Sequence, residues 1–189
     1  MRKSSRRYRP SCLRNGRPRR KTKVPNETKQ MSAAGLSALR AREGAVLHYY
    51  NDIANNCTFG VGGLAHHGPC TDDEMRRPVS VADVNAQLAV SVRSAEVAVR
   101  RQVQRRELTQ DQFDALVSYA YNTGPSGARP VLAAANAGQD ADVVAHMSRN
   151  VNVHPRDVHG RRLQPVRSAG LVNRRREEAA PFRTAADAQ

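Results

Sequence analysis

The feature that most constrains the fold is a long apolar stripe between residues 80 and 103. Ser80 is a suitable N-cap for a helix, and apolar residues then recur in steps of three and four, which places them on one helix face. At 1.5 Å per residue, about 25 residues form a helix of roughly 37 Å, so we expect a helix that spans two lobes. The stripe consists of Val81, Val84, Leu88, Val92, Ala95, Val99 and Val103.

The remaining pattern predicts short helices around one small β region. A first helix is expected from Ser32, a preferred N-cap residue, to Gly44, which suits the position after a helix end. A third is expected from Thr109 to the turn formers at 122–127, a fourth from Pro130 to Gly138, and further helices at 140–148 and 170–182. Residues 58–62 predict a short hairpin strand, and residues 149–167 fit no element.

Positive charge is concentrated at the N-terminus. The chain has a net charge of +14, and residues 1–30 hold twelve basic residues against one acidic residue, Glu27. Few apolar residues accompany them, so we expect residues 1–30 to be a disordered tail and residues 31–189 to be the folded domain. Such a tail is suited to polyanions through Coulomb attraction; a non-functional extension is the alternative.

Several classes of protein are excluded by composition. No uncharged apolar run approaches the ~18 residues of a membrane span, and the charged N-terminus lacks the apolar region of a secretory signal. Three cysteines are too few for a small fold held by disulfides. Eight aromatic residues offer few stacking platforms for single-stranded nucleic acid.

Two carboxylates in contrasting surroundings are the candidates for chemistry. Glu43 shares a helix face with Leu36 and Leu39, whereas Asp52 follows Asn51 on a polar turn. Cleavage of a glycosidic bond needs one carboxylic acid to protonate the leaving oxygen and a second, ionised carboxylate. Burial would raise the pKa of Glu43 and suit it to the first role, and Asp52 would remain ionised.

The spacing of these residues resembles phage-type lysozyme, the endolysin or muramidase family of glycoside hydrolases. Eight residues separate Glu43 from Asp52 and five separate Asp52 from Thr58, which opens a Thr-x-Gly-x-Gly strand. Asn122 and Gly124 are similar to the family's turn after a helix. The matching residues at the first site are Glu43, Gly44, Tyr50, Asp52, Thr58, Gly60 and Gly62.

The resemblance implies an α+β, mainly α, fold with two lobes: a small β-hairpin lobe and a helical C-terminal lobe joined by the long helix. It implies Glu43 as general acid, with Asp52 and Thr58 holding the attacking water, and hence inversion at the anomeric carbon. Carboxyl groups roughly 6.5–9.5 Å apart would fit inversion. Tyr50, Gly60 and Gly62 are then expected to contact substrate, and no metal or organic cofactor is implied.

The activity implied by the resemblance is hydrolysis of the β-1,4 bond between N-acetylmuramic acid and N-acetylglucosamine in peptidoglycan, by a monomer, with lysis of a bacterial cell. It implies synthesis in the host cytoplasm and action in the periplasm or cell wall. One alternative is a lytic transglycosylase, which needs the acid but not the water-positioning pair. Another is a non-catalytic protein that binds polyanions or the cell wall through its tail.

The sequence also departs from the family pattern. Gly63 stands where the family usually has His, and the chain has no Trp. Cys57 and Cys70 flank His66 and His67; two Cys and two His can ligate zinc, but the spacing matches no standard finger, and a Cys57–Cys70 disulfide is expected in an oxidising compartment. Arg174 is either the partner that orients Glu43 or part of a solvated Arg-rich face.

Overall fold

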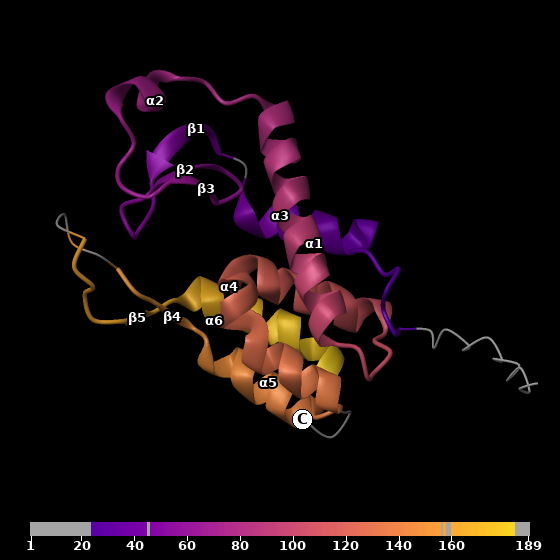
Figure 1. Ribbon diagram of the computed structural model, residues 1–189. Helices are drawn as coiled ribbons and strands as arrows, with labels where there is room; N and C mark the ends of the chain where they lie inside the picture. The colour runs from indigo at the N-terminus through magenta and orange to yellow at the C-terminus, as the bar shows by residue number, and fades with distance from the viewer. Residues whose placement is uncertain (1–23, 45, 156, 158–159, 184–189) are drawn as a thin grey trace, which may run out of the picture.

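The computed structural model describes residues 24–44, 46–155, 157 and 160–183, except the side chain of Glu43. Figure 1 shows two lobes: a small sheet with one short helix, and a bundle of helices. The long helix α3 (Val81–Gln102) leaves the small lobe and runs into the helical one. This arrangement confirms the α+β, mainly helical, two-lobed fold predicted from the sequence.

Helix α1 (Ala33–Glu43) begins and ends where the sequence predicts. The side chain of Ser32 caps it by accepting a hydrogen bond from the Gly35 N–H at 3.0 Å, and Gly44 follows its last residue. Asp114 of the helical lobe accepts hydrogen bonds from the Ser32 N–H and hydroxyl. A Cβ on Gly35 would lie 2.6 Å from Oδ2 of Asp114, so glycine permits the close approach of α1 to the helix that carries Asp114, α4 (Gln110–Ala137).

The small lobe contains three antiparallel strands rather than the single hairpin strand that the sequence predicts. They are β1 (Val46–Asn51), β2 (Cys57–Gly60) and β3 (Gly63–His66), in the order β1-β2-β3, with α2 (Asp72–Arg76) beside β1. Strand β1 has no fully buried residue, so it lacks the alternation of buried and exposed positions by which a strand is recognised.

Helix α3 carries the predicted stripe. Ser80 caps it through a reciprocal capping box with Asp83, and the stripe residues from Val84 to Val103 are buried. Val81 is 60% exposed, so its assignment to the buried face is wrong: as the first residue of the helix, it precedes the part that packs on α4.

Helix α4 spans Gln110–Ala137 with a break at Gly124, whose φ of 72° and ψ of 163° are not helical. The sequence predicts a helix end at this turn, and a new helix from Pro130. The second half begins instead at Pro125, directly after the break, and Pro130 lies inside it. Proline is tolerated in the first turn of a helix because the N–H it lacks would have no intrahelical partner, and Pro125 occupies that position.

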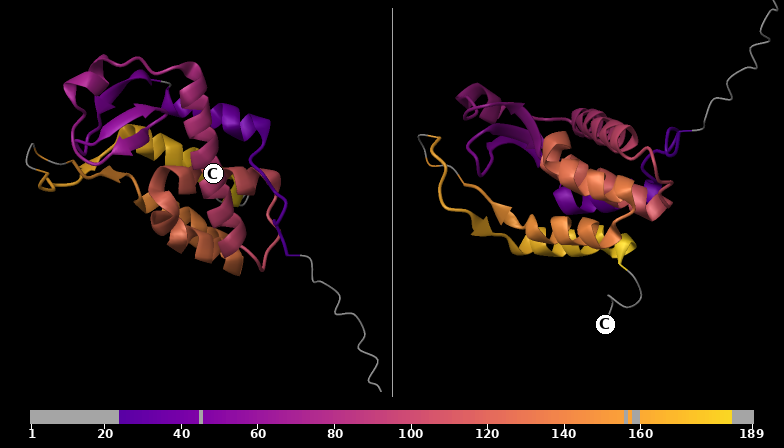
Figure 2. Two further views of the ribbon diagram at one scale, coloured as in Figure 1. Left: turned by 45° about the horizontal axis from the view of Figure 1, so that its top comes forward. Right: turned by 60° about the horizontal axis from the view of Figure 1, so that its bottom comes forward.

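The chain ends in α5 (Asp140–Arg149), α6 (Ala169–Ala179) and a 3₁₀ turn (Ala180–Phe182). Between α5 and α6 lies a hairpin of β4 (Asn152–Val153) and β5 (Val166–Arg167). Figure 2 shows this hairpin projecting from the helical lobe on the side of the small sheet. Each strand has only two residues, too few for a periodic signal in the sequence.

The buried core joins the two lobes and includes part of the predicted tail. Asn26 is 5% exposed; its side chain donates hydrogen bonds to the carbonyls of Val103 and Arg106 and accepts one from the Leu108 N–H. Asn26 thus anchors the segment before residue 31 to the folded domain. Residues 1–23 of the predicted tail lie outside the described residues.

Within the described part of the chain, no helix combines the length and the hydropathy that crossing a bilayer requires.

Candidate active site

The small lobe brings together Tyr50, Asp52 and Thr58. Tyr50 of β1 pairs with Thr58 of β2, and Asp52 follows at the end of β1, in the turn that connects the two strands. Residues that are eight apart in sequence are thus direct cross-strand neighbours. The pairing of β1 with β2 therefore brings the three motif residues close together in space.

The Asp52 carboxylate is held by the turn that it begins. Its Oδ1 accepts hydrogen bonds from the N–H groups of Ala54 (2.8 Å) and Asn56 (2.9 Å), and the Asp52 N–H donates to the Asn56 carbonyl at 2.9 Å. Asn55 has a φ of 58°, a left-handed conformation that Asn tolerates. Among the described residues, the hydrogen bonds of the carboxylate all go to Oδ1.

Thr58 is buried, with 3% of its surface exposed. Its hydroxyl donates to the Asn56 carbonyl at 3.2 Å, so its oxygen keeps lone pairs for an outside donor. The next residues of the motif close the strand: Gly60 has a φ of 65° and Gly62 a φ of 68°. A Cβ on Gly60 would lie 2.8 Å from Oε1 of Gln87, so this turn lies close against α3.

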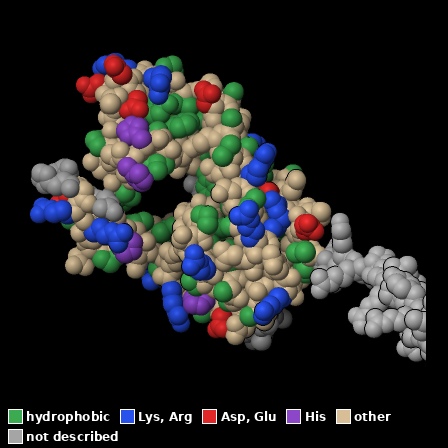
Figure 3. All heavy atoms as spheres, viewed as in Figure 1, with side chains coloured by type: hydrophobic (Ala, Val, Ile, Leu, Met, Phe, Trp, Pro, Cys, Tyr) green, Lys and Arg blue, Asp and Glu red, His purple; other side chains and the backbone are tan. Residues whose placement is uncertain are grey.

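Glu43 is the last residue of α1, next to Gly44, whose φ of 60° turns the chain toward β1. The side chain of Glu43 lies outside the part of the chain that the structure describes, so the separation of the Glu43 and Asp52 carboxyl groups stays a prediction. Figure 3 shows a hollow between the small lobe and the projecting part of the helical lobe, with histidine side chains along the edge of the small lobe.

A buried ionic cluster in the helical lobe lies beside this end of α1. The Glu178 carboxylate accepts hydrogen bonds from Nε of Arg174 (2.9 Å), from a terminal nitrogen of Arg175 and from the Ser118 hydroxyl (2.7 Å). Arg174 and Arg175 are 9% and 2% exposed, so the interpretation of these arginines as a solvated face is wrong. Arg175 also donates to the Asn122 side chain.

The sequence carries a signal for this cluster, because Glu178 follows the two arginines at the i+4 and i+3 spacings of helix neighbours. Next to it, Arg42 of α1 donates to the exposed Glu177 at 2.6 Å and to the Ser118 hydroxyl at 3.4 Å. The cluster thus connects α4 and α6 with the last turn of α1, where Glu43 lies. An open pocket of about 400 Å³ adjoins it, lined by Arg42, Val153, Ser168, Gly170, Leu171, Asn173, Arg174 and Glu177.

A second pocket of about 580 Å³ lies between the β2–β3 turn and helices α3 and α4. Its lining includes Gly63 and Gln87, and their contact explains why position 63 is a glycine. A Cβ on Gly63 would lie 0.7 Å from Nε2 of Gln87, so the Gln87 amide occupies the space of a side chain at position 63. Oε1 of Gln87 is buried without a hydrogen-bond partner among the described residues.

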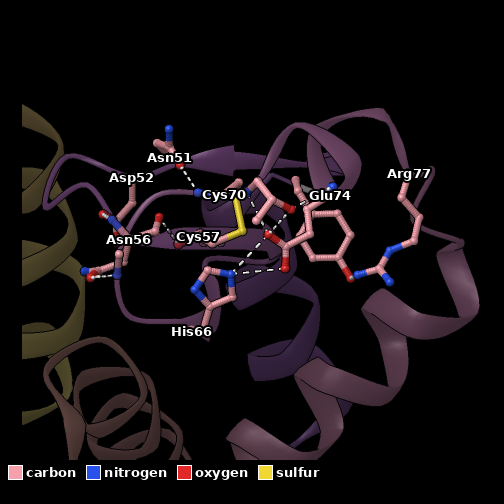
Figure 4. Close-up of a disulfide and its surroundings, with 12 residues drawn as sticks. Asn51, Asp52, Asn56, Cys57, His66, Cys70, Glu74 and Arg77 are labelled. Carbon is pink, nitrogen blue, oxygen red and sulfur yellow. Dashed lines mark hydrogen bonds and ion pairs between the residues drawn. A yellow bond between two sulfur atoms is a disulfide. The ribbon is translucent and has the colours of Figure 1, made fainter.

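Cys57 and Cys70 form a disulfide that connects the start of β2 to the loop before α2 (Figure 4). His66 lies beside it, with Nε2 at 3.1 Å from a Glu74 oxygen. Hydrogen bonds to the His67 carbonyl and to Glu74 raise the pKa of His66, and the Thr71 N–H together with His66 lowers the pKa of Glu74 to about 2. His66 and Glu74 therefore form an ion pair whenever His66 is protonated, and the raised pKa of His66 favours that form.

Sequence reasoning did not single out Glu74, although it completes a reciprocal capping box with Thr71 at the start of α2. That pattern, Thr followed three residues later by Glu, was the available signal. Cys57, His66 and Glu74 place one donor atom each within 4.8 Å of one another. His67 instead lies near the Asn56 side chain, at 3.4 Å.

Comparison with known proteins agrees with this architecture. The chain is 30% identical over 165 residues to an endolysin of Bacillus phage PZA, an alignment that covers 81% of this chain and 55% of that protein. The chain thus spans about half the length of this curated relative.

Solved structures match it over nearly their whole length. An endolysin from the Escherichia coli O157:H7 phage FAHEc1 is 30% identical with a TM-score of 0.65, over 82% of this chain and 94% of that one. The muramidase domain of SpmX from Asticaccaulis excentricus is 26% identical with a TM-score of 0.63, over 82% and 98%. Residues 40–178, from the end of α1 to Glu178, match the phage lysozyme family. The chain therefore belongs to the phage lysozyme family.

Proposed function

We propose that the chain is a peptidoglycan hydrolase that cleaves the β-1,4 bond between N-acetylmuramic acid and N-acetylglucosamine. The observation that supports this most is the placement of Asp52 and Thr58 at one end of the small sheet, beside the β1–β2 turn, of a phage lysozyme family member, with α1 ending at Glu43 just before that sheet. A pair of carboxylic residues is what hydrolysis of a glycosidic bond requires, and a hydroxyl beside them can help to hold the attacking water.

In this proposal Glu43 protonates the leaving oxygen of the scissile bond. The hydrogen bonds from Ala54 and Asn56 fix Oδ1 of Asp52, and Oδ2 accepts a proton from the attacking water. The Thr58 hydroxyl oxygen, held by its bond to the Asn56 carbonyl, accepts a hydrogen bond from the other O–H of that water and aligns it, and this second proton stays on the hydroxyl of the product sugar. Attack by water from the face opposite the leaving group gives inversion.

Tyr50, Gly60 and Gly62 are proposed to contact the sugar chain. Tyr50 is the cross-strand partner of Thr58, and Gly62, which has a positive φ, exposes backbone without a side chain over it, whereas Gly60 is buried against α3. This places polar backbone groups and one aromatic side chain along the edge of the small lobe, as carbohydrate binding requires.

A lytic transglycosylase is the alternative reaction on the same bond. It requires the general acid only, so the ordered Asp52 turn and the buried Thr58 hydroxyl favour hydrolysis. The mass of the products separates the two reactions, because an anhydro-sugar lacks one water. We expect hydrated muramic acid ends that form first as the α-anomer; anhydro ends would contradict hydrolysis, and a first-formed β-anomer would contradict inversion.

The proposed site of action is the bacterial cell wall, and the proposed acting form is a monomer. The basic residues at positions 1–23 are proposed to contact polyanions at that wall. Removal of residues 1–23 leaves the Asn26 contacts with the domain in place. We expect lysis by the shortened chain to lose part of its dependence on salt concentration; an unchanged salt profile would contradict a role for this segment.

A further inference from the structure

The disulfide of the small lobe lies within a set of metal-ligand side chains. Cys57 comes from β2, His66 from the end of β3, Cys70 from the following loop, and Glu74 from α2. A donor atom of each of Cys57, His66 and Glu74 lies within 4.8 Å of the other two, and Cys70 is bonded to Cys57. Three donors from three segments thus lie close together, and the sulfur of Cys70, from a fourth segment, is bonded to the first of them (Figure 4).

We propose that the reduced chain binds one Zn²⁺ through Cys57, Cys70, His66 and Glu74, and that this metal site and the disulfide are alternative cross-links of the small lobe. Two thiolates, one imidazole and one carboxylate are ligands that zinc takes in tetrahedral geometry. At zinc–ligand distances of 2.0–2.3 Å, tetrahedral ligand atoms lie about 3.3–3.8 Å apart, so the donors need only small shifts once the sulfur atoms separate.

The surroundings already orient two of the ligands. Nδ1 of His66 lies 3.2 Å from the His67 carbonyl oxygen, which leaves Nε2 to face Glu74 at 3.1 Å. Metal-bound histidines commonly donate from the other ring nitrogen to a carbonyl in this way. The Thr71 N–H and hydroxyl each hold Oε2 of Glu74 at 2.8 Å, so Oε1 is the oxygen left to bind a metal.

The site is available only after reduction, because disulfide sulfur does not supply a thiolate. A phosphine reductant converts the disulfide and one water into two thiols and the phosphine oxide. Binding of Zn²⁺ then releases the two thiol protons. Compartments rich in thiols disfavour disulfides, and there zinc would hold together the same segments that position Thr58, the residue after Cys57.

The test uses the full chain with Cys12→Ser, so that only Cys57 and Cys70 supply thiols. After reduction and removal of the reductant, Co²⁺ is added as a spectroscopic substitute for zinc, followed by Zn²⁺. We expect thiolate-to-cobalt charge-transfer absorption and tetrahedral d–d bands that saturate at one Co²⁺ per chain and disappear when Zn²⁺ displaces it. The oxidised chain should show neither.

His66→Gln and Glu74→Gln should each weaken Co²⁺ binding at least tenfold and change the d–d bands, as loss of a ligand does. The matched controls are His67→Gln, the neighbouring histidine outside the cluster, and Asp73→Asn, an exposed carboxylate on the same helix. If reduction unfolds the small lobe, circular dichroism will detect the loss of structure. Addition of the metal to the reduced chain should then restore the spectrum of the folded protein. Absence of the charge-transfer band, or Co²⁺ binding that is the same in His66→Gln as in His67→Gln, would overturn the proposal.

Discussion

The hydroxyl of Tyr121 donates a hydrogen bond to the carbonyl of Val61 at 2.5 Å, and this bond links α4 of the helical lobe directly to the β2–β3 turn. Val61 is 3% exposed and belongs to the core. The contact sets the distance between the two lobes at the end of the strand that carries Thr58. It therefore fixes the β2–β3 turn against α4 beside the pocket that Tyr121 lines.

Tyr121→Phe should lower the free energy of unfolding by about 1 kcal/mol, since it removes one hydrogen bond to a buried carbonyl. Urea denaturation measures this change. Tyr49→Phe is the control: its hydroxyl accepts a hydrogen bond from the exposed Arg77, and its loss should cost less than about 0.5 kcal/mol. Equal losses of unfolding free energy in the two variants would contradict a specific contribution of the Tyr121–Val61 hydrogen bond to stability.

The two adjacent glutamates of α6 should differ strongly. The Glu178 side chain is 1% exposed and contacts two buried arginines, whereas Glu177 is 57% exposed and pairs with Arg42. Glu178→Gln leaves two guanidinium groups buried without a carboxylate, which should cost about 3–5 kcal/mol. Glu177→Gln should cost less than about 1 kcal/mol. A loss below about 1 kcal/mol in Glu178→Gln would contradict the structural role assigned to the cluster.

Position 63 and Gln87 should be energetically coupled. A Cβ at Gly63 overlaps the Gln87 amide, so Gly63→Ala must displace that side chain and should be destabilising. Gln87→Ala removes the overlap, and the double variant should be more stable than the sum of the two single changes predicts, by about 0.5–3 kcal/mol. Additive changes in a urea-denaturation double-mutant cycle would contradict the coupling.

The number of free thiols tests the disulfide. The chain has three cysteines, and Cys57 and Cys70 are bonded to each other. The oxidised protein, unfolded in denaturant, should therefore react with a thiol reagent once per chain, at Cys12, and three times after reduction. Three reactive thiols before reduction would contradict the bridge.

Local signals in the sequence predicted the longer helices, because most of them begin with a residue that satisfies free N–H groups of the first turn; α5 is an exception without a side-chain cap, and the short α2 was not predicted. Ser32, Ser80, Thr109 and Ser168 all accept hydrogen bonds in this position. The β4–β5 hairpin could not be recognised in the same way. Its strands are short and its exposed Leu163 and Val166 resemble core residues in the sequence, although the structure leaves both about half exposed.

The candidate site shows the same limit. The spacing of Asp52 and Thr58 was readable because both lie on one local turn and strand. Contacts between elements far apart in the sequence could not be read in this way. Arg175 of α6 contacts Asn122 of α4, and Gln87 of α3 contacts Gly63 of β3, only because these elements pack together in the fold. Arg175 is as polar as any surface residue; its spacing to Glu178 indicates an ion pair, but its burial results from the packing of α6 against α4, which the sequence does not reveal.

The central claim is that Glu43 supplies the proton for cleavage of the glycosidic bond. Glu43→Gln keeps the size of the side chain and removes the acid, and the control is Glu107→Gln, an exposed glutamate outside the proposed site. Circular dichroism first checks that both variants are folded. The rate at which each clears a turbid peptidoglycan suspension then measures its activity. We predict a loss of at least about 100-fold for Glu43→Gln and wild-type clearing for Glu107→Gln. Clearing by Glu43→Gln at close to the wild-type rate would contradict the account.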